Sequence, residues 1–215
     1  IGGPSMVRSA AKNFKFVTGT DYSTPSLPAM PAKGTSVTDP NFNTPIVRIT
    51  DKTKDGYTGP GIENEYARSD PENSDGTRLA LRGNDGEWYL YSATDYKLLK
   101  HLEITGGGQE PEPRWDTVNP KIFYYLYGME LRAYNIDTNI SSTIRDFTRD
   151  VAGAAMITTK TEGDASVDRK LWCLMAQDES GEKTMAVFAY DKSQNKILGK
   201  KTSFPDPINW VSADM

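Results

Sequence analysis

The sequence predicts an all-β fold made of four-stranded antiparallel blades of a β-propeller. A turn signal followed by an apolar strand recurs about every 45 residues, which is typical of such blades. The turns begin at Asp75, Asn119, Asp168 and Asp214. Helix signals are scarce, and the 18 Gly and 13 Pro among 215 residues are spread along the chain, as suits many short strands and turns.

Residues 1–42 form a Pro-rich lead-in that we expect to lie along the surface of the domain. Pro25, Pro28, Pro31 and Pro40 stand among Ser, Thr and Gly in this segment, and proline is excluded from central strands. The partial propeller spans 43–215. It opens with an alternating strand near 45–50, which would be an outer strand awaiting a partner blade.

Three full blades and the start of another follow. We expect them at about 65–105, 112–147, 164–204 and 208–215. In the first blade the strands would lie near 65–69, 77–82, 87–92 and 98–104, with a hairpin turn at Gly83-Asn84-Asp85-Gly86. A short helical turn is expected over 150–157, although Gly153 interrupts it.

Alternation along the strands predicts the core between successive blades. The side chains expected there are Leu79, Leu81, Ile122, Tyr124, Leu171 and Cys173. Three blades and a fraction do not close a ring, and blades of this length usually occur in sevens or eights. We therefore expect partner blades in the same or another chain.

One segment resembles a known family. Ser74-Asp75-Gly76-Thr77-Arg78-Leu79-Ala80-Leu81 is similar to the Ser-Pro-Asp-Gly-Lys-Xaa-Leu-Ala motif of TolB-like and WD-like bacterial propellers, and Glu112-Pro113-Arg114-Trp115 resembles the strand before that motif. The resemblance covers about 43–215. It implies a fold and not one activity, because the family includes protein-binding modules, peptidase caps and oligogalacturonate lyases. Asp70-Pro71-Glu72-Asn73 departs from the pattern as an insertion, and blade three lacks the turn glycine.

Composition excludes several classes of function. The net charge is −4 and no Lys/Arg-rich run occurs, so we expect no nucleic-acid partner. No apolar stretch approaches the ~20 residues that span a bilayer. The single cysteine forms no disulfide within the chain. The absence of a disulfide does not place the protein in the cytosol, because many periplasmic proteins lack disulfides. We expect a periplasmic or secreted protein.

Most catalytic signatures are absent. His101 is the only histidine, which excludes any site within this chain that needs two, including the multi-histidine metal site that the resemblance implies for oligogalacturonate lyases. It falls on an expected outer strand, away from the channel. No Gly-Xaa-Ser-Xaa-Gly elbow occurs. Gly106-Gly107-Gly108 lacks the Lys-Ser/Thr of a phosphate loop, so a blade-to-blade turn is expected there.

Acidic residues precede each expected inner strand, where a propeller lines its central channel. The candidate ligand-binding set is Glu63, Glu65, Arg68, Glu110, Glu112, Arg114, Trp115, Glu162, Asp164, Asp206 and Trp210. No cofactor is expected apart from a Ca²⁺ ion, which carboxylates suit; aromatic faces suit sugars and cations. The alternative is that these are solvated loop charges, some of them paired with arginine.

Two functions remain open at this point, and so does the question of enzymatic activity. The first is a non-catalytic propeller that binds a protein or glycan through its channel face. The alternative is part of a secreted carbohydrate-active enzyme, a polysaccharide lyase or glycoside hydrolase, whose remaining catalytic residues lie outside this chain. Glu65, Glu112 and Asp164 are expected at equivalent places on adjacent blades, where their like charges call for a cation or an arginine.

Overall fold

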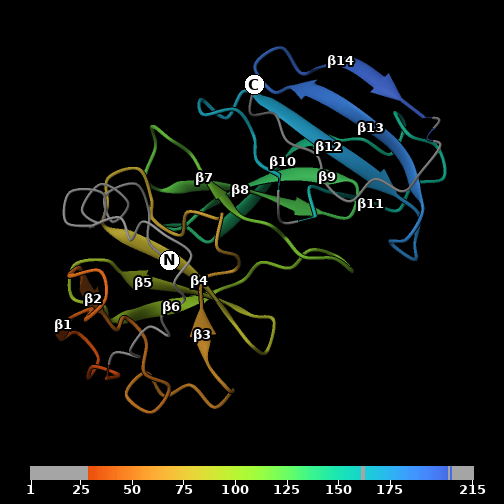
Figure 1. Ribbon diagram of the computed structural model, residues 1–215. Coiled ribbons are helices and arrows are strands. Elements are labelled where there is room, and N and C mark those ends of the chain that lie inside the picture. The colour runs from red at the N-terminus through yellow and green to blue at the C-terminus, as the bar shows by residue number, and fades with distance from the viewer. Residues whose placement is uncertain (1–28, 161–162, 203, 205–215) are drawn as a thin grey trace, which may run out of the picture.

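The computed structural model describes residues 29–160, 163–202 and 204, and within them the chain is all-β (Figure 1). The strands form three four-stranded antiparallel sheets, which we call blades one, two and three, and one two-stranded sheet. The two-stranded sheet pairs β1 (Ser36–Thr38) with β2 (Pro45–Val47). In the described ranges no helix is long and apolar enough to cross a membrane.

Each blade is a meander in which consecutive strands are neighbours. Blade one contains β3 (Ile62–Glu63), β4 (Arg78–Gly83), β5 (Trp88–Ser92) and β6 (Leu98–Leu102). Blade two contains β7 (Arg114–Trp115), β8 (Ile122–Tyr127), β9 (Glu130–Asn135) and β10 (Ile140–Asp146). Blade three contains β11 (Met156–Thr158), β12 (Leu171–Gln177), β13 (Thr184–Asp191) and β14 (Lys196–Lys201).

The first strand of each blade differs most from the sequence-based expectation. In blade one it lies at Ile62–Glu63 and not at 65–69, and in blade three it lies at Met156–Thr158, ahead of residue 164. No helical turn covers 150–157, because residues 148–153 form turns and the residues after them enter β11. Pairing of Ile157 with Ala176 of β12 outweighs the weak helical propensity of this alanine-rich segment.

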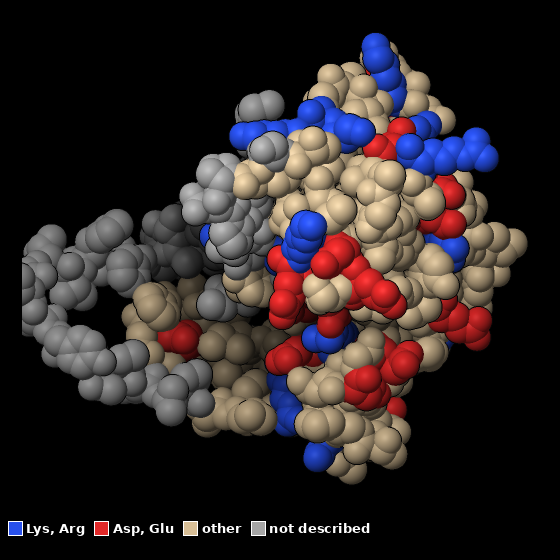
Figure 2. All heavy atoms as spheres, turned by 90° about the vertical axis from the view of Figure 1, so that its right-hand side faces the viewer, with Lys and Arg blue, Asp and Glu red and all other residues tan. Residues whose placement is uncertain are grey.

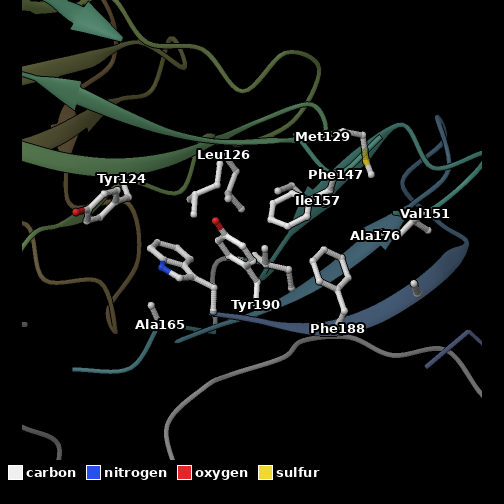
Figure 3. Packing of buried hydrophobic residues seen from close by; sticks show 14 of the residues in the cluster. Tyr124, Leu126, Met129, Phe147, Val151, Ile157, Ala165, Ala176, Phe188 and Tyr190 are labelled. Atoms are coloured by element: carbon white, nitrogen blue, oxygen red, sulfur yellow. The ribbon is translucent and has the colours of Figure 1, made fainter. Parts of the chain in front are cut away.

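Side chains alternate between the two faces of each sheet, so that adjacent blades bury a common core. Between blades two and three, Leu126 and Phe147 point toward Phe188 and Tyr190 (Figure 3). The ring centroid of Phe147 lies 5.0 Å from those of both Phe188 and Tyr190. Between blades one and two, Trp88 and Leu90 belong to a second cluster that also contains Trp115, Phe123 and Tyr134.

The expected core was correct in part. Tyr124 is buried between blades two and three, and Leu79 and Leu81 are also buried. The leucines, however, face away from blade two and are covered by the chain that precedes blade one. Ile122 is half-buried. Leu171 is 38% exposed and Cys173 is half-buried, because the neighbouring Trp172 and Leu174 are the residues of β12 that face blade two.

The chain before blade one packs on that blade. Ile49 and Tyr57 contact the apolar cluster of Leu79, Leu81 and Tyr91. The strand expected near 45–50 as the outer strand of another blade pairs instead with β1. Of the predicted lead-in, residues 1–28 lie outside the described ranges.

Candidate inner-strand charge cluster

The first strand of blade one is interrupted where it faces the middle of the molecule. Glu63 pairs with Arg82, and pairing with β4 resumes only where Glu72 forms a bridge with Leu79. Residues 64–70 loop out between these two points. The loop is closed by its own polar groups, since Asn64 Nδ2 donates to the backbone oxygens of Tyr66 and Ser69 at 2.7 and 2.8 Å.

Blade two carries a one-residue version of the same interruption. The Leu126 amide donates to the Pro111 carbonyl, whereas Arg114 pairs with Tyr124. One extra residue therefore stands in the first strand, which is the arrangement of a β-bulge. Glu112 lies at this point with a φ of 47°, in the left-handed region.

The first strand of blade three is also interrupted, and the interruption lies opposite the same part of the second strand as in blades one and two. Thr158 pairs with Met175, and backbone bonding to β12 is seen again where the Ser166 amide donates to the Leu171 carbonyl. Glu65, Glu112 and Asp164 all lie in these three interruptions, which bring them together although they are far apart in sequence. We call Glu65, Glu112, Arg114, Asp164 and Arg169 the channel cluster.

Arg114 connects the three blades. Its Nη1 lies 3.0 Å from Glu65 Oε2 of blade one, and its Nε lies 3.5 Å from Asp164 Oδ1 of blade three. Arg114 Nη2 also donates to the Gly163 carbonyl at 3.4 Å. The Arg114 and Glu65 side chains are only 6% and 4% exposed, so this ion pair is shielded from solvent. A guanidinium suits this role because its planar fork donates in several fixed directions.

Asp164 is shared between two arginines. Arg169 Nη1 lies 2.5 Å from Asp164 Oδ1, and Arg169 Nε donates to the Trp115 carbonyl at 3.0 Å. The Asp164 side chain is 36% exposed, which makes it the most accessible carboxylate with a direct contact to Arg114. A cation or an arginine was expected beside these carboxylates, and the structure places two arginines there, Arg114 and Arg169.

Glu112 is held by the neighbouring blade. The Thr158 hydroxyl donates to one of its carboxylate oxygens, and the Thr159 hydroxyl donates to the other. The Thr159 amide adds a bond of 3.0 Å to Oε2. Glu112 is 2% exposed, so these donors replace water around its charge. The carboxylate thus fastens the bulge of blade two to β11 of blade three.

Glu65 is the least satisfied group in the channel cluster. Burial raises the pKa of its carboxyl above the ordinary value, the Arg114 charge opposes this, and the Glu112 charge adds to it. Ser69 Oγ donates to Glu65 Oε2 at 3.1 Å, whereas Oε1 is buried without a hydrogen-bond partner among the described residues. Perturbed carboxyl groups of this kind occur both in active sites and in structural ion-pair networks.

The other candidate residues do not join the cluster. Glu63 is exposed and accepts a bond of 3.1 Å from Asn84, Glu110 lies 2.5 Å from Arg82, and Arg68 is exposed. Trp115 does not present a face for a sugar, because it is 5% exposed and its indole donates to the Pro71 carbonyl at 2.8 Å. Glu162, Asp206 and Trp210 lie outside the described residues.

His101 lies on β6, the outer strand of blade one, as expected. Its Nε2 is 2.8 Å from Glu87 Oε2, and its ring stands edge-on to Tyr89. In the described part of the chain no group of three or more His, Cys, Asp or Glu side chains could hold a metal ion. Gly106-Gly107-Gly108 forms part of the connection between blades one and two, where Gly107 and Gly108 have positive φ angles.

Three residues of the site were not found from the sequence. Thr158 and Thr159 precede the residues taken as the start of blade three, so nothing in the repeat marked them. Arg169 stands two residues after Val167, in a turn where the repeat would place glycine, and its φ of 57° is left-handed. The absence of glycine at this turn was the one sequence signal that residue 169 is kept for its side chain, which pairs with Asp164.

No protein-family model and no curated protein sequence matches the chain. Among solved structures, an oligogalacturonate lyase from Vibrio parahaemolyticus matches with a TM-score of 0.52 and 14% identity. An oligogalacturonate lyase in complex with manganese matches with the same TM-score and identity.

The chain has the fold of a β-propeller segment. Each match covers 80% of this chain and 50% of the solved one, so the chain spans about half the length of these structures. At 14% identity the likeness extends to the fold alone. The three four-stranded antiparallel sheets are its blades.

Proposed function

We propose that this chain supplies three blades of a non-catalytic propeller that binds a protein or glycan through its channel face. The observation that carries the proposal is the state of the channel cluster. Glu112 and Arg114 have their hydrogen bonds taken by protein groups of the neighbouring blades. Charges that are buried and paired in this way orient the blades and are poorly placed to transfer protons to a ligand.

The accessible residues of the candidate set, including Asp164 of the channel cluster, would make the contacts with the ligand. Glu63 and Arg68 are exposed, and Glu110 and Asp164 are partly exposed. Together they offer carboxylate acceptors to hydroxyl or basic groups and one guanidinium donor. Figure 2 shows one face of the molecule on which Asp and Glu side chains gather, with Lys and Arg side chains among them and across its upper part. Such a mixed polar surface suits a hydroxyl-rich or basic ligand better than a polyanion.

A binding experiment tests the proposal. We expect titration calorimetry with a panel of neutral and acidic oligosaccharides and basic peptides to reveal at least one ligand. Glu110→Gln and Asp164→Asn should weaken its binding, and His101→Ala, on the outer strand, should not. If the His101→Ala variant alone lost binding, or if no panel member bound, the channel-face proposal would fail.

A second function is favoured by the solved structures that share the fold. Both of those proteins are oligogalacturonate lyases, and one is in complex with manganese. We propose as the alternative that the chain is part of a secreted or periplasmic carbohydrate-active enzyme of the TolB-like propeller type, with its remaining catalytic residues outside the chain. The described residues offer a metal only scattered carboxylates, and a Ca²⁺ site would need some of those now paired with arginine.

Incubation with oligogalacturonate separates the two functions. The binding proposal predicts no cleavage products by chromatography with manganese, with calcium or with a chelator, and products that require manganese would support the enzyme. Because a partial propeller would lack catalytic groups, the same assay on the longest natural form of the protein is the decisive arm.

A further inference from the structure

The last strand of each blade leaves one edge of its backbone unpaired. These strands are β6, β10 and β14, and no other strand of the described residues pairs with their outer edges. An unpaired edge is a template for a further strand, and proteins commonly protect it with charged side chains or with a β-bulge. The three edges differ in how far they carry these protections.

Two of the three edges are protected along their length. Strand β14 has three exposed lysines, and a bulge at Leu198 divides it into two short parts. Strand β6 has its bulge at Leu99, and the two residues that follow are Lys100 and the exposed His101. Antiparallel pairing of two copies of either strand would bring lysines close to one another, and like charges that face each other across strands are destabilising.

The edge of β10 lacks both protections over its first four residues. Ile140, Ser141, Ser142 and Thr143 pair in regular register with β9, and the bulge comes only after them, at Ile144. All four residues are exposed and none is charged. They therefore form the longest regular and uncharged stretch among the three outer strands. We call residues 140–143 the open edge.

We propose that the open edge joins two copies of this chain into a symmetric dimer, in which β10 of one copy pairs antiparallel with β10 of the other. A two-fold axis makes the same strand meet itself in reverse. Whether the axis passes Ser141 or Ser142, only Ile, Ser and Thr side chains of residues 140–144 face one another. Such pairs are favourable across antiparallel strands. The two blades would then share one continuous sheet.

The charges at the two ends of the open edge fit this arrangement. Lys100 Nζ donates to Asn139 Oδ1 at 2.5 Å, beside the start of β10. Asp146 is exposed at the end of β10, and Arg145 next to it is already held by Asp150 at 2.7 Å. Because the paired strands run in opposite directions, Lys100 of each copy would stand near Asp146 of the other. A second copy therefore supplies both the uncharged strand and the matching charges.

The dimer would leave the channel cluster of both copies uncovered. Strand β10 and strand β7, which carries Arg114, lie at opposite edges of blade two. The dimer does not depend on the ligand binding proposed above and can be tested without a ligand. Two linked channel faces would, however, bind a ligand with repeated units more tightly than one, because the second contact becomes intramolecular.

Sedimentation velocity over a range of concentrations tests the dimer. We expect a monomer–dimer equilibrium in the unaltered chain. Ser142→Lys and Ser142→Glu should each be monomeric, because like charges would meet near the two-fold axis. An equal mixture of these two variants should recover the dimer. Ser74→Lys, on an exposed turn of blade one, and Leu198→Ser, on the edge of β14, are the controls and should dimerise like the unaltered chain.

Two further measurements locate the contact. Circular dichroism shows that the variants at the exposed residue 142 are folded, and amide hydrogen exchange should show residues 140–143 gaining protection as the dimer forms. A synthetic peptide of residues 138–146 should compete with the dimer and raise the monomer fraction.

Three results would overturn the proposal. These are an unaltered chain that stays monomeric up to its solubility limit, a Ser142→Lys variant that still dimerises, and a mixture of the two charged variants that does not. If the chain stayed monomeric while the peptide protected its open edge from exchange, this edge would belong to a peptide partner and the dimer would be rejected.

Discussion

At the residue scale, Arg114 has the greatest consequence for stability. It is buried between a carboxylate of blade one and a carboxylate of blade three. Removing one member of a buried ion pair leaves the other charge without compensation. The Glu65 carboxyl, whose pKa is already raised by burial, would be the group left behind.

Arg114→Met should therefore lower the free energy of unfolding by about 3–5 kcal/mol, as measured by urea denaturation. Lys121→Met is the matched control, because Lys121 pairs with Asp137 on the surface with both side chains more than half exposed. Exposed pairs contribute little, so the control should unfold near the wild-type urea concentration. Similar losses in the two variants would show that Arg114 is not in a shielded pair.

The turn aspartates predict how stability depends on pH. The side-chain bonds from Ser166 and Lys170 lower the pKa of Asp168 from 3.8 to about 2. A carboxyl whose pKa is lowered by folding stabilises the folded state above its unfolded pKa, and this contribution disappears as the pH falls through the folded value. Asp168→Asn should therefore be less stable than wild type near pH 6, with a difference that shrinks between about pH 4 and pH 2. Urea denaturation across this range measures it, and a difference that does not change with pH would contradict the assignment.

The sequence predicts positions at this scale better than contacts. The positions ahead of the repeated turns were enough to group Glu65, Glu112 and Asp164. They could not reveal that Trp115 is buried, since an aromatic residue at the start of an inner strand can point to either side of the sheet. They also could not find Thr158, because its role depends on a carboxylate 46 residues earlier in the chain.

At the scale of the elements, the second, third and fourth strands of blade one lie within two residues of the expected 77–82, 87–92 and 98–104. They are five or six residues long and follow recognisable turns. The first strands have only two or three residues, too few to show a period of two. Their positions are set by pairing with the second strand and by the interruptions that carry the channel cluster, which is information that no local pattern contains.

Strand β4 gives a test of this packing. Leu81 is 5% exposed beneath the chain that precedes blade one, so Leu81→Asp would bury an unpaired charge and should destabilise the protein severely, by more than about 3 kcal/mol. Leu171→Asp, at a position that is 38% exposed, should cost much less. Thermal unfolding followed by circular dichroism compares them. Equal losses would mean that the face of blade three that carries Leu171 is as well covered as the interior.

At the scale of the whole molecule, the repeat itself identifies the fold. Its spacing predicted blades, and the structure contains three of them in sequence order (Figure 1). The packing of residues 33–57 on blade one could not have been foreseen, because these residues carry no repeat and include the largely buried Lys33–Asp55 ion pair. The central feature of the assembled molecule is that the interruptions of three first strands converge on Arg114.

A double-mutant cycle between blade one and blade three tests that convergence most directly. Glu65 and Asp164 both contact Arg114, so Glu65→Gln or Asp164→Asn alone removes one of these two ion pairs, whereas both changes together remove both. The free energy of unfolding from urea denaturation should fall in the double variant by about 0.5–3 kcal/mol more than the sum of the single losses. Glu65→Gln combined with Asp168→Asn, which has no contact with Arg114, should be additive. Additivity of Glu65→Gln and Asp164→Asn within about 0.3–0.5 kcal/mol would contradict a shared cluster.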